Sequence, residues 1–343
     1  MPHDEVRWGA RATGFRGLRH NNPFGKSLKA LWERFLGAAL LGFVFVSVFF
    51  ITGCGGHTGP EVVLYCSQDE VYAEPICKEF ERQTGIKVRP VFDTESVKTV
   101  GLVNRLLAES GNPQCDVFWN NEEFRTRQLA ARGIFRATNG WSKLGYRSRR
   151  IVINTNLLTP EKAIHLFSEA TNTAWRGKVA LAYPLFGTTG THFLALRQRW
   201  GDAAWQNWCR ALAANQPFLC DGNSIVVRQV ASGQAWLGFT DSDDIAAGRR
   251  EGLPVAALPV NEETLFLPNT VGVVRGAPHP AEAEKLFEFI NQPEVSQRLV
   301  DAQALEGASM AAIQGERGLQ VDWDSLLRDL DTATAEMKEI FLR

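Results

Sequence analysis

Three aspartates lie within five residues in the stretch Thr240-Asp241-Ser242-Asp243-Asp244. The stretch ends an apolar run typical of a buried strand, and open α/β sheets bind ligands at the carboxyl ends of their strands. Neighbouring carboxylates ionise together in a closed, partly dry cleft only when a cation lies between them. We therefore predict that Asp241, Asp243 and Asp244 bind a metal ion or an ammonium group. The alternative is a solvated loop in which Asp244 caps the next helix, which accounts for one aspartate but not for three.

A Gly/Thr-rich stretch, residues 187–192 (GTTGTH), has the opposite character. It opens a predicted helix, so its free backbone N–H groups and the positive end of the helix dipole favour an anion. The alternative is an ordinary helix start capped by a threonine. His192 offers a metal ligand, although a histidine one turn into a helix is more often packed. We predict that a carboxylate, phosphate or phosphonate binds here, at Thr188, Thr189, Gly190 and Thr191, together with Asn223 and Ser224.

The elements that must position these residues alternate between strand and helix in the N-terminal half. The short apolar runs predict strands, and apolar residues at helical spacing predict the helices between them. Strand, helix, strand is the βαβ unit, which builds parallel sheets covered by helices. The predicted strands are Glu61–Cys66, Ile86–Val91 and Asp116–Trp119, and the predicted helices are Tyr72–Thr84, Val97–Ser110 and Phe124–Arg132.

A longer β-rich run, Ser148–Thr155, precedes a second set of alternating elements, and another, Thr270–Val274, follows it. Two α/β lobes joined by two β crossings place a ligand cleft between the lobes. We predict that residues 61–150 and 270–343 form lobe 1 and that residues 151–269 form lobe 2. The predicted elements of the second set are helix Pro160–Leu166, strand Val179–Ala182, a long helix Thr191–Ala213, strand Pro217–Leu219, helix Ser224–Ser232 and strand Trp236–Thr240; the amphipathic helix Ala281–Asn291 follows the second crossing.

An uncharged apolar run, Phe35–Ile51, follows the basic residues Lys26, Lys29 and Arg34 and leads to Thr52-Gly53-Cys54. The run is shorter than the ~20 residues of a spanning helix and has the layout of an export signal. A small residue before the cysteine resembles the bacterial lipobox. The prediction is therefore a signal peptide over residues 1–53 that is cleaved, a lipid on Cys54, and a Gly-rich tether over residues 54–60. The alternative is a plain membrane-spanning anchor.

The formal net charge of −1 among 343 residues gives no electrostatic footprint for nucleic acid, so we expect no nucleic-acid partner. Apart from Cys54 the chain has an odd number of cysteines in a compartment that is usually oxidising, so at least one thiol should stay unpaired within the chain. Cys209 and Cys220 fall on a predicted helix and on the strand after it. The sequence favours neither a disulfide between them nor two separate thiols. The spacing of cysteine and histidine predicts no zinc site.

In this order of elements the chain resembles the class II periplasmic solute-binding proteins of ABC importers, and most closely the ferric-binding cluster that also holds thiamine, polyamine and aminophosphonate binders. The resemblance implies an α/β fold of two lobes, each a mixed, mainly parallel sheet flanked by helices, which close over a ligand. The segments that carry it span nearly all of the chain after Cys54: VVLYCSQD at 62–69, FERQTGIKV at 80–88, CDVFWNNE at 115–122, RSRRIVINT at 147–155, AYPLFGTTGTH at 182–192, NSIVVRQVASGQAWLGFTDSDD at 223–244 and NTVGVVRGAPHPAEAEKLFEFI at 269–290.

The sequence departs from the ferric-binding pattern at the ligand. Where those proteins carry two adjacent tyrosines, this chain has Asp243 and Asp244. The resemblance also matches Asp69 to an iron-binding histidine, and it matches Asn121, with Glu122 beside it, to an iron-binding glutamate. Iron binding through tyrosinates is therefore not predicted, and Asp69, Asn121 and Glu122 join the expected ligand set.

We accordingly expect a monomeric, lipid-anchored solute-binding protein on the outer side of the cytoplasmic membrane, whose partner is an ABC permease. The expected ligand is a metal cation of the iron type, held by carboxylate oxygens with an anion on the threonine loop. The alternative is a small zwitterion such as an aminophosphonate. An extracytoplasmic hydrolase is a distant third hypothesis, because no nucleophile with its base is evident, and we expect no enzyme.

Overall fold

The computed structural model describes residues 59–93, 100–313 and 318–342. The predicted signal peptide, Cys54 and most of the tether lie outside these residues, as does the start of the helix predicted from Val97. No helix among the described residues is both long and apolar enough to cross a membrane.

One mixed sheet runs through the described molecule in the order β2-β1-β3-β9-β4-β7-β5-β6, with β8 paired to β4. At one end β2, β1 and β3 are parallel, at the other end β7, β5 and β6 are parallel, and the antiparallel β4 and β9 lie between the two sets. The strands are β1 (Glu61–Cys66), β2 (Lys87–Phe92), β3 (Val117–Asn120), β4 (Trp141–Asn154), β5 (Val179–Ala182), β6 (Phe218–Cys220), β7 (Leu237–Asp241), β8 (Val255–Ala257) and β9 (Phe266–Val273).

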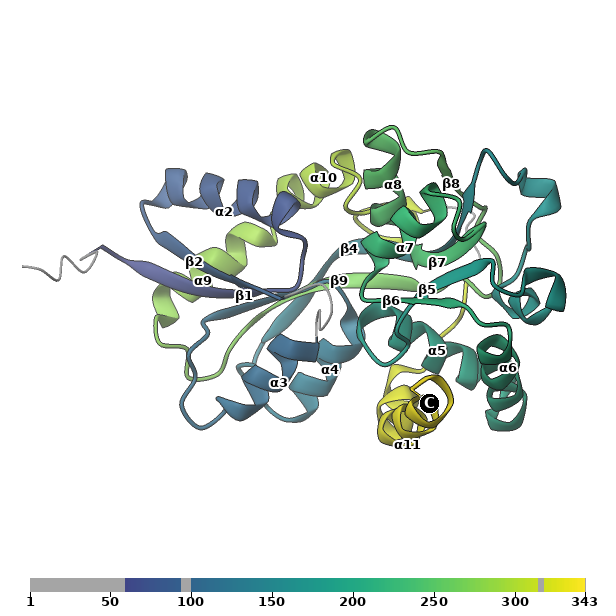
Figure 1. Cartoon of the computed structure of the whole chain (residues 1–343). Coiled ribbons are helices and arrows are strands. Elements are labelled where there is room, and N and C mark those ends of the chain that lie inside the picture. The colour runs from purple at the N-terminus through teal and green to yellow at the C-terminus, as the bar shows by residue number, and fades with distance from the viewer. Residues whose placement is uncertain (1–58, 94–99, 314–317, 343) are drawn as a thin grey trace, which may run out of the picture. The chain divides into compact units, whose positions relative to one another are not determined.

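Helices cover both faces of each end of the sheet (Figure 1). Apolar cores lie beneath them, for instance around Phe80 and Leu286 on one face of the first end and around Phe167 and Phe193 at the second end. The helices are α2 (Glu70–Thr84), α3 (Val100–Ala108), α4 (Glu123–Ala131), α5 (Gly187–Trp200), α6 (Asp202–Ala214), α7 (Asn223–Ala231), α8 (Ser242–Arg250), α9 (Pro280–Ile290), α10 (Pro293–Asp301) and α11 (Trp323–Phe341).

Strands β4 and β9 connect the two ends of the sheet. Residues 141–148 of β4 pair with β9, and residues 149–153 of the same strand pair with β7. The sequence predicted only the second half of β4, because Trp141–Arg147 carries polar and basic residues at positions that its composition did not mark as a strand. The lobe boundaries near residues 150 and 270 fall on these two strands and stay a prediction.

The long helix predicted from Thr191 to Ala213 is wrong as one element. Gly201 has a φ of +79° and separates α5 from α6, and Asp202 forms an ion pair with Arg197 at 3.0 Å across the break. The helix predicted over Pro160–Leu166 is also wrong, since only Pro160–Lys162 forms a single 3₁₀ turn there.

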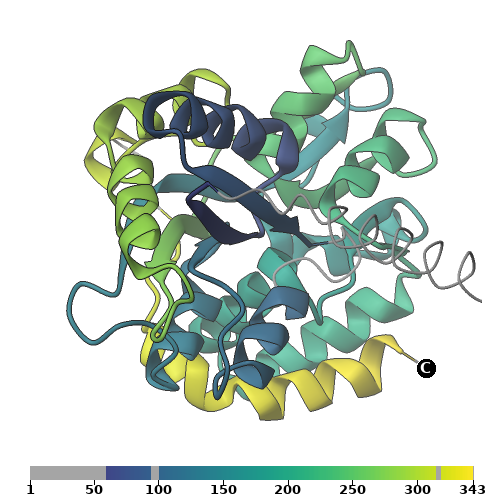
Figure 2. The ribbon, with the colours of Figure 1, turned by 90° about the vertical axis from the view of Figure 1, so that its left-hand side faces the viewer.

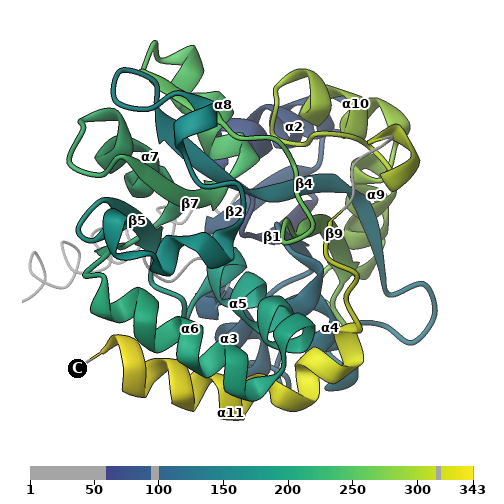
Figure 3. The ribbon, with the colours of Figure 1, turned by 90° about the vertical axis from the view of Figure 1, so that its right-hand side faces the viewer.

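The C-terminal helix α11 packs against α5, α6 and α4 (Figures 2 and 3). Its buried side chains Leu326, Leu330, Met337 and Phe341 belong to the same apolar core as Phe193 of α5. The sequence analysis predicted no helix here and placed residues 270–343 in lobe 1, whereas the main packing partners of α11, α5 and α6, lie in the predicted lobe 2.

The cysteines Cys66, Cys77, Cys115, Cys209 and Cys220 are all buried, and Cys77, Cys115, Cys209 and Cys220 are free thiols. Cys209 and Cys220 are therefore not bridged: they belong to two different apolar cores. Burial raises the pKa of Cys77 to about 12, so its thiol stays protonated, and Cys77 is a core residue.

Candidate functional site

A cavity of about 440 Å³, including its open mouth, lies at the carboxyl ends of the parallel strands. Strands β5, β6 and β7 lie side by side, and the next element after each is a helix, α5, α7 or α8; α8 follows β7 directly, whereas short loops precede α5 and α7. Asn121, after β3 of the first lobe, completes the wall. The cavity is lined by Asn121, Arg147, Ala182, Tyr183, Phe186, Gly187, Thr188, Thr189, Asp221, Gly222, Asn223, Asp241 and Asp244.

Two arginines of β4 compensate two of the three clustered aspartates. Arg147 and Arg149 are two residues apart on the strand, so their side chains leave the same face. Arg147 Nη1 donates to Asp243 Oδ2 at 2.6 Å, and its Nη2 lies 3.3 Å from Asp241 Oδ2. Arg149 Nη1 donates to Asp241 Oδ1 at 2.7 Å. All four side chains are buried, so this is a charge network inside the protein.

The neighbours of Arg147 and Asp241 in this network keep both side chains ionised. Burial opposes the charge of Arg147, but Asp243 and Asp241 outweigh it and raise the pKa of the guanidinium. Burial alone would raise the pKa of Asp241, yet Arg147 and Arg149 lower it. Both residues are therefore ionised. The sequence analysis expected a cation from outside to lie between these carboxylates, whereas the chain supplies arginines.

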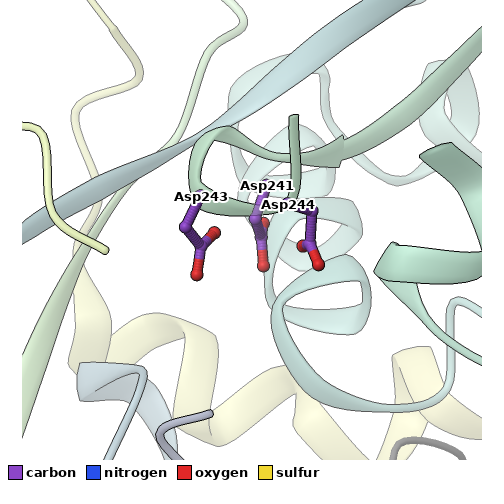
Figure 4. Close-up of side chains that lie close together, drawn as sticks. All are labelled: Asp241, Asp243 and Asp244. Carbon is purple, nitrogen blue, oxygen red and sulfur yellow. The ribbon is translucent and has the colours of Figure 1, made fainter. Parts of the chain in front are cut away.

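The three aspartates lie side by side at the start of α8 (Figure 4). One carboxylate oxygen from each lies within 4.8 Å of the others. Asp241 occupies the N-cap position without a capping hydrogen bond from its side chain, and Asp243 and Asp244 lie in the first turn, where the helix dipole favours negative charge. Asp244 is therefore not the cap that the alternative interpretation assumed.

The Gly/Thr stretch forms the first turn of α5, which begins at Gly187, four residues before the predicted start. Gly187 has a φ of +51°, which glycine adopts most readily. Thr188 Oγ1 donates to Asp241 Oδ2 at 2.7 Å, and Thr189 Oγ1 lies 3.4 Å from Asn223 Oδ1. The Gly190 N–H donates to the Phe186 carbonyl, and this glycine does not line the cavity. No threonine caps α5, because Phe186 is at its N-cap position.

Asn223 begins α7 and joins the same network. Its Nδ2 donates to Asp241 Oδ2 at 3.1 Å, and its Oδ1 accepts from Arg149 Nη1 at 3.0 Å. Ser224, the next residue, does not line the cavity. The side chains of Thr188 and Asn223, two members of the predicted anion-binding set, thus hydrogen-bond to Asp241. The first turns of α5 and α7 still direct backbone N–H groups toward the cavity.

Glu122 contacts the opposite lobe. The hydroxyl of Thr191 in α5 donates to Glu122 Oε2, and Glu122 itself is fully buried at the start of α4. Burial raises the pKa of Glu122. Neither Glu122 nor Thr191 lines the cavity, whereas Asn121 does. The sequence analysis placed Asn121 and Glu122 together in the ligand set. In the structure Asn121 lies at the cavity, whereas Glu122 makes a contact between the lobes.

Asp69 precedes α2, is half-buried and does not line the cavity. It lies close enough to Arg147 to help raise the pKa of that arginine. His192 is a packed residue: its Nε2 lies 2.7 Å from the Glu263 carbonyl oxygen, its ring packs edge-on against Phe167, and burial lowers its pKa to about 3.

Sequence reasoning missed Arg147 and Arg149, and also the lining residues Tyr183, Phe186 and Asp221. The sequence did contain a signal for the two arginines, because RSRRIVIN places three arginines at the start of a β-branched run. A charged side chain on a strand that continues into a core is either paired with an opposite charge or part of a functional site.

The fold and the cavity together define a two-lobed solute-binding protein of the type II class, as the resemblance implied. The chain belongs to the family of bacterial extracellular solute-binding proteins, whose model matches residues 62–302.

Solved structures of periplasmic binding proteins share the fold at low identity. AfuA from Actinobacillus pleuropneumoniae, with fructose-6-phosphate bound, has a TM-score of 0.71 at 18% identity over 82% of this chain and 99% of its own. Iron-bound HitA from Pseudomonas aeruginosa has a TM-score of 0.70 at 16% identity over 82% and 99%. The Trichodesmium protein in complex with iron and citrate has a TM-score of 0.64 at 18% identity over 82% and 100%.

Proposed function

We propose that this protein captures one small solute in the cavity between its lobes and delivers it to the permease of an ABC importer. The observation that carries the proposal is the cavity itself, in which three helix starts of one lobe face Asn121 of the other. Membership of a solute-binding family supports it.

The preferred ligand carries an acidic group. Arg147 lines the cavity, and it stays charged because Asp243 and Asp241 raise its pKa. The first turns of α5 and α7 present backbone N–H groups beside it. These are the donors that bind carboxylate, phosphate and phosphonate oxygens. The structure of AfuA, which has the same fold, contains a sugar phosphate, so this scaffold accommodates such a group.

The same ligand would carry an ammonium group at its other end. Asp221 and Asp244 also line the cavity, on the α7 and α8 walls. These two lining side chains place carboxylate oxygens at the cavity wall, where an ammonium group would bind. A small zwitterion, such as 2-aminoethylphosphonate, matches both walls.

An iron-type cation with a bound anion is the second candidate, because Asp241, Asp243 and Asp244 bring three carboxylate oxygens within 4.8 Å. Oxygen ligands suit hard cations. This candidate ranks second because a metal ion at that point would displace Arg147 from Asp243 and would face its charge. The two arginines thus reverse the order of preference that the sequence gave.

Isothermal titration of the metal-stripped protein tests the proposal. We expect 2-aminoethylphosphonate to bind and ferric citrate and Mn²⁺ not to bind. Asp244→Asn should weaken phosphonate binding at least about tenfold, since a hydrogen bond to a charged group contributes ~1.5–3 kcal/mol. Asp329→Asn, on an exposed residue of α11, is the control and should change nothing. Binding of ferric citrate with no binding of the phosphonate would establish the second candidate instead.

The predicted lipid on Cys54 would hold the monomeric protein on the outer side of the cytoplasmic membrane, close to the permease. The residues before Gly59 lie outside the described structure, so the support comes from the short apolar run and the small residue before Cys54.

A further inference from the structure

Arg250, the last residue of α8, extends from the second lobe to two segments of the first. Its Nη2 donates to Tyr72 Oη in α2 at 2.5 Å. Its Nη1 donates to the Ala302 carbonyl at 2.9 Å and lies 3.2 Å from Gln303 Oε1, directly after α10. One guanidinium therefore connects α8 with both α2 and the end of α10.

Tyr72 is a suitable partner for this arginine. Its side chain is 8% exposed, and its ring lies 5.8 Å from the central carbon of the guanidinium. Burial raises the pKa of Tyr72, so the phenol stays neutral at physiological pH and accepts the hydrogen bond through its oxygen. The contact combines a charged donor, a neutral acceptor and an aromatic face, and it joins an exposed arginine to a buried tyrosine.

Helix α8 links this contact to the ligand cavity. The nine-residue helix carries Asp243 and Asp244 in its first turn and Arg250 at its end. Tyr72 lies near enough to Asp243 for that carboxylate to raise its pKa as well. Neither Tyr72, Arg250, Ala302 nor Gln303 lines the ligand cavity. The contact therefore lies outside the lining of the cavity.

We propose that Tyr72 and Arg250 form a clasp that holds the two lobes closed and that Arg250 is a positioning residue for ligand binding. Closing the clasp fixes α8, and with it the aspartates at its start, against the first lobe. Opening the lobes separates the guanidinium from Tyr72 and from the end of α10. Apparent affinity is the intrinsic affinity multiplied by the fraction of closed protein, so the clasp raises affinity without touching the solute. The effect of the clasp on affinity rests on the proposed function, whereas its effect on the closure of the lobes does not.

The distance between the lobes in the ligand-free protein tests the clasp. Spin labels at Lys78→Cys on α2 and Ala204→Cys on α6 occupy exposed positions in the two lobes, and the five described native cysteines are buried. Double electron–electron resonance should give one short distance for the labelled parent, and Arg250→Met should add a longer one. Arg249→Met is the matched control, with the same residue type, helix and loss of charge, and it should leave the distribution unchanged.

Tyr72→Phe removes only the hydroxyl. If Arg250→Met does not fold, the same distance measurement on Tyr72→Phe tests the clasp. We expect it to add a smaller population at the longer distance, and the two substitutions together should open the lobes no further than Arg250→Met alone. In a second arm, the dissociation rate of 2-aminoethylphosphonate should rise about tenfold in Arg250→Met while the association rate stays within about twofold.

The two arms separate the two proposals. An unchanged distance distribution in both variants, or a long distance already dominant in the parent, would overturn the clasp. If the distances change as expected and the phosphonate does not bind even the parent, the clasp stands and the ligand assignment fails. Equal opening in Arg249→Met would show a general effect of surface charge and would also overturn the clasp.

Discussion

Arg147 and Arg149 change the chemistry of the acidic cluster. Asp241 and Asp243 would be costly to bury alone, but each lies against a guanidinium that is itself buried. Thr188 and Asn223 supply further hydrogen bonds to Asp241. The network therefore serves two purposes: it satisfies the charges at the end of β7, and it presents Arg147 to the cavity.

Asp241→Asn should destabilise the protein. Removing one partner of a buried ion pair leaves the other charge uncompensated, so we expect the free energy of unfolding to fall by ~3–5 kcal/mol at pH 7. Urea unfolding followed by tryptophan fluorescence measures this, with Asp329→Asn as the exposed control. A loss below about 0.5 kcal/mol, the usual size of a surface effect, would contradict the network.

The pH dependence follows from the same aspartate. Arg147 and Arg149 lower the pKa of Asp241 in the folded protein, so its stabilising contribution is complete above the unfolded pKa of about 4 and is lost as pH falls through the folded pKa. The difference in unfolding free energy between wild type and Asp241→Asn should therefore shrink below about pH 4. A difference that grows toward low pH would refute this assignment.

The element that positions the arginines is β4, which crosses from one end of the sheet to the other. Its pairing with β9 shifts register between Lys143 and Gly145, just before Arg147. Gly145 has a φ of +153°, and a Cβ there would lie 2.7 Å from Leu305 Cδ1 and 2.9 Å from the Gly307 carbonyl oxygen. The bulge therefore requires glycine, both for its backbone and for the close approach of the segment after α10.

Gly145→Ala should strain this crossing. We expect a loss of ~1–3 kcal/mol in unfolding free energy, the range for a strained backbone position, together with weaker binding of any cavity ligand because Arg147 follows two residues later. Chemical denaturation and titration calorimetry give both values. Gly111→Ala, where a Cβ would meet nothing within 4 Å, is the matched control. Equal effects of the two substitutions would show that the bulge has no special role.

For the whole molecule, the predicted lipid anchor would determine where the protein works. A cavity between two lobes releases its solute usefully only beside a permease, and a lipid on Cys54 would keep the protein at that membrane. The Gly-rich residues after Cys54 would give the folded part freedom to approach the permease.

Cys54→Ala should block processing. The variant should keep residues 1–53 and migrate as the heavier precursor, while wild type should incorporate radiolabelled palmitate and begin at Cys54. Mass spectrometry of the membrane fraction distinguishes the two forms. Cys66→Ala, at a buried thiol of β1, is the control and should be processed normally. A wild-type protein that begins near Met1 would disprove the signal-peptide prediction.

The sequence by itself determined the class of fold and most of the alternating strands and helices up to α9. Strands such as β1 and β5 were predicted to the residue, because a short β-branched run between turn residues has one stable arrangement in an α/β protein. It also assigned Asp241, Asp244, Thr188 and Asn223 to the ligand site, and all four line one cavity. That they bind a ligand stays a prediction.

Only the tertiary structure decided what those residues contact. Arg147 and Arg149 precede their aspartates by more than 90 residues, and nothing local in the chain pairs them. The break at Gly201, the packing of α11 on α5 and α6, and the contact of Tyr72 with Arg250 were equally out of reach. Local patterns specify hydrogen bonds and faces within an element, whereas charge pairing and helix packing depend on which distant surfaces the fold brings together.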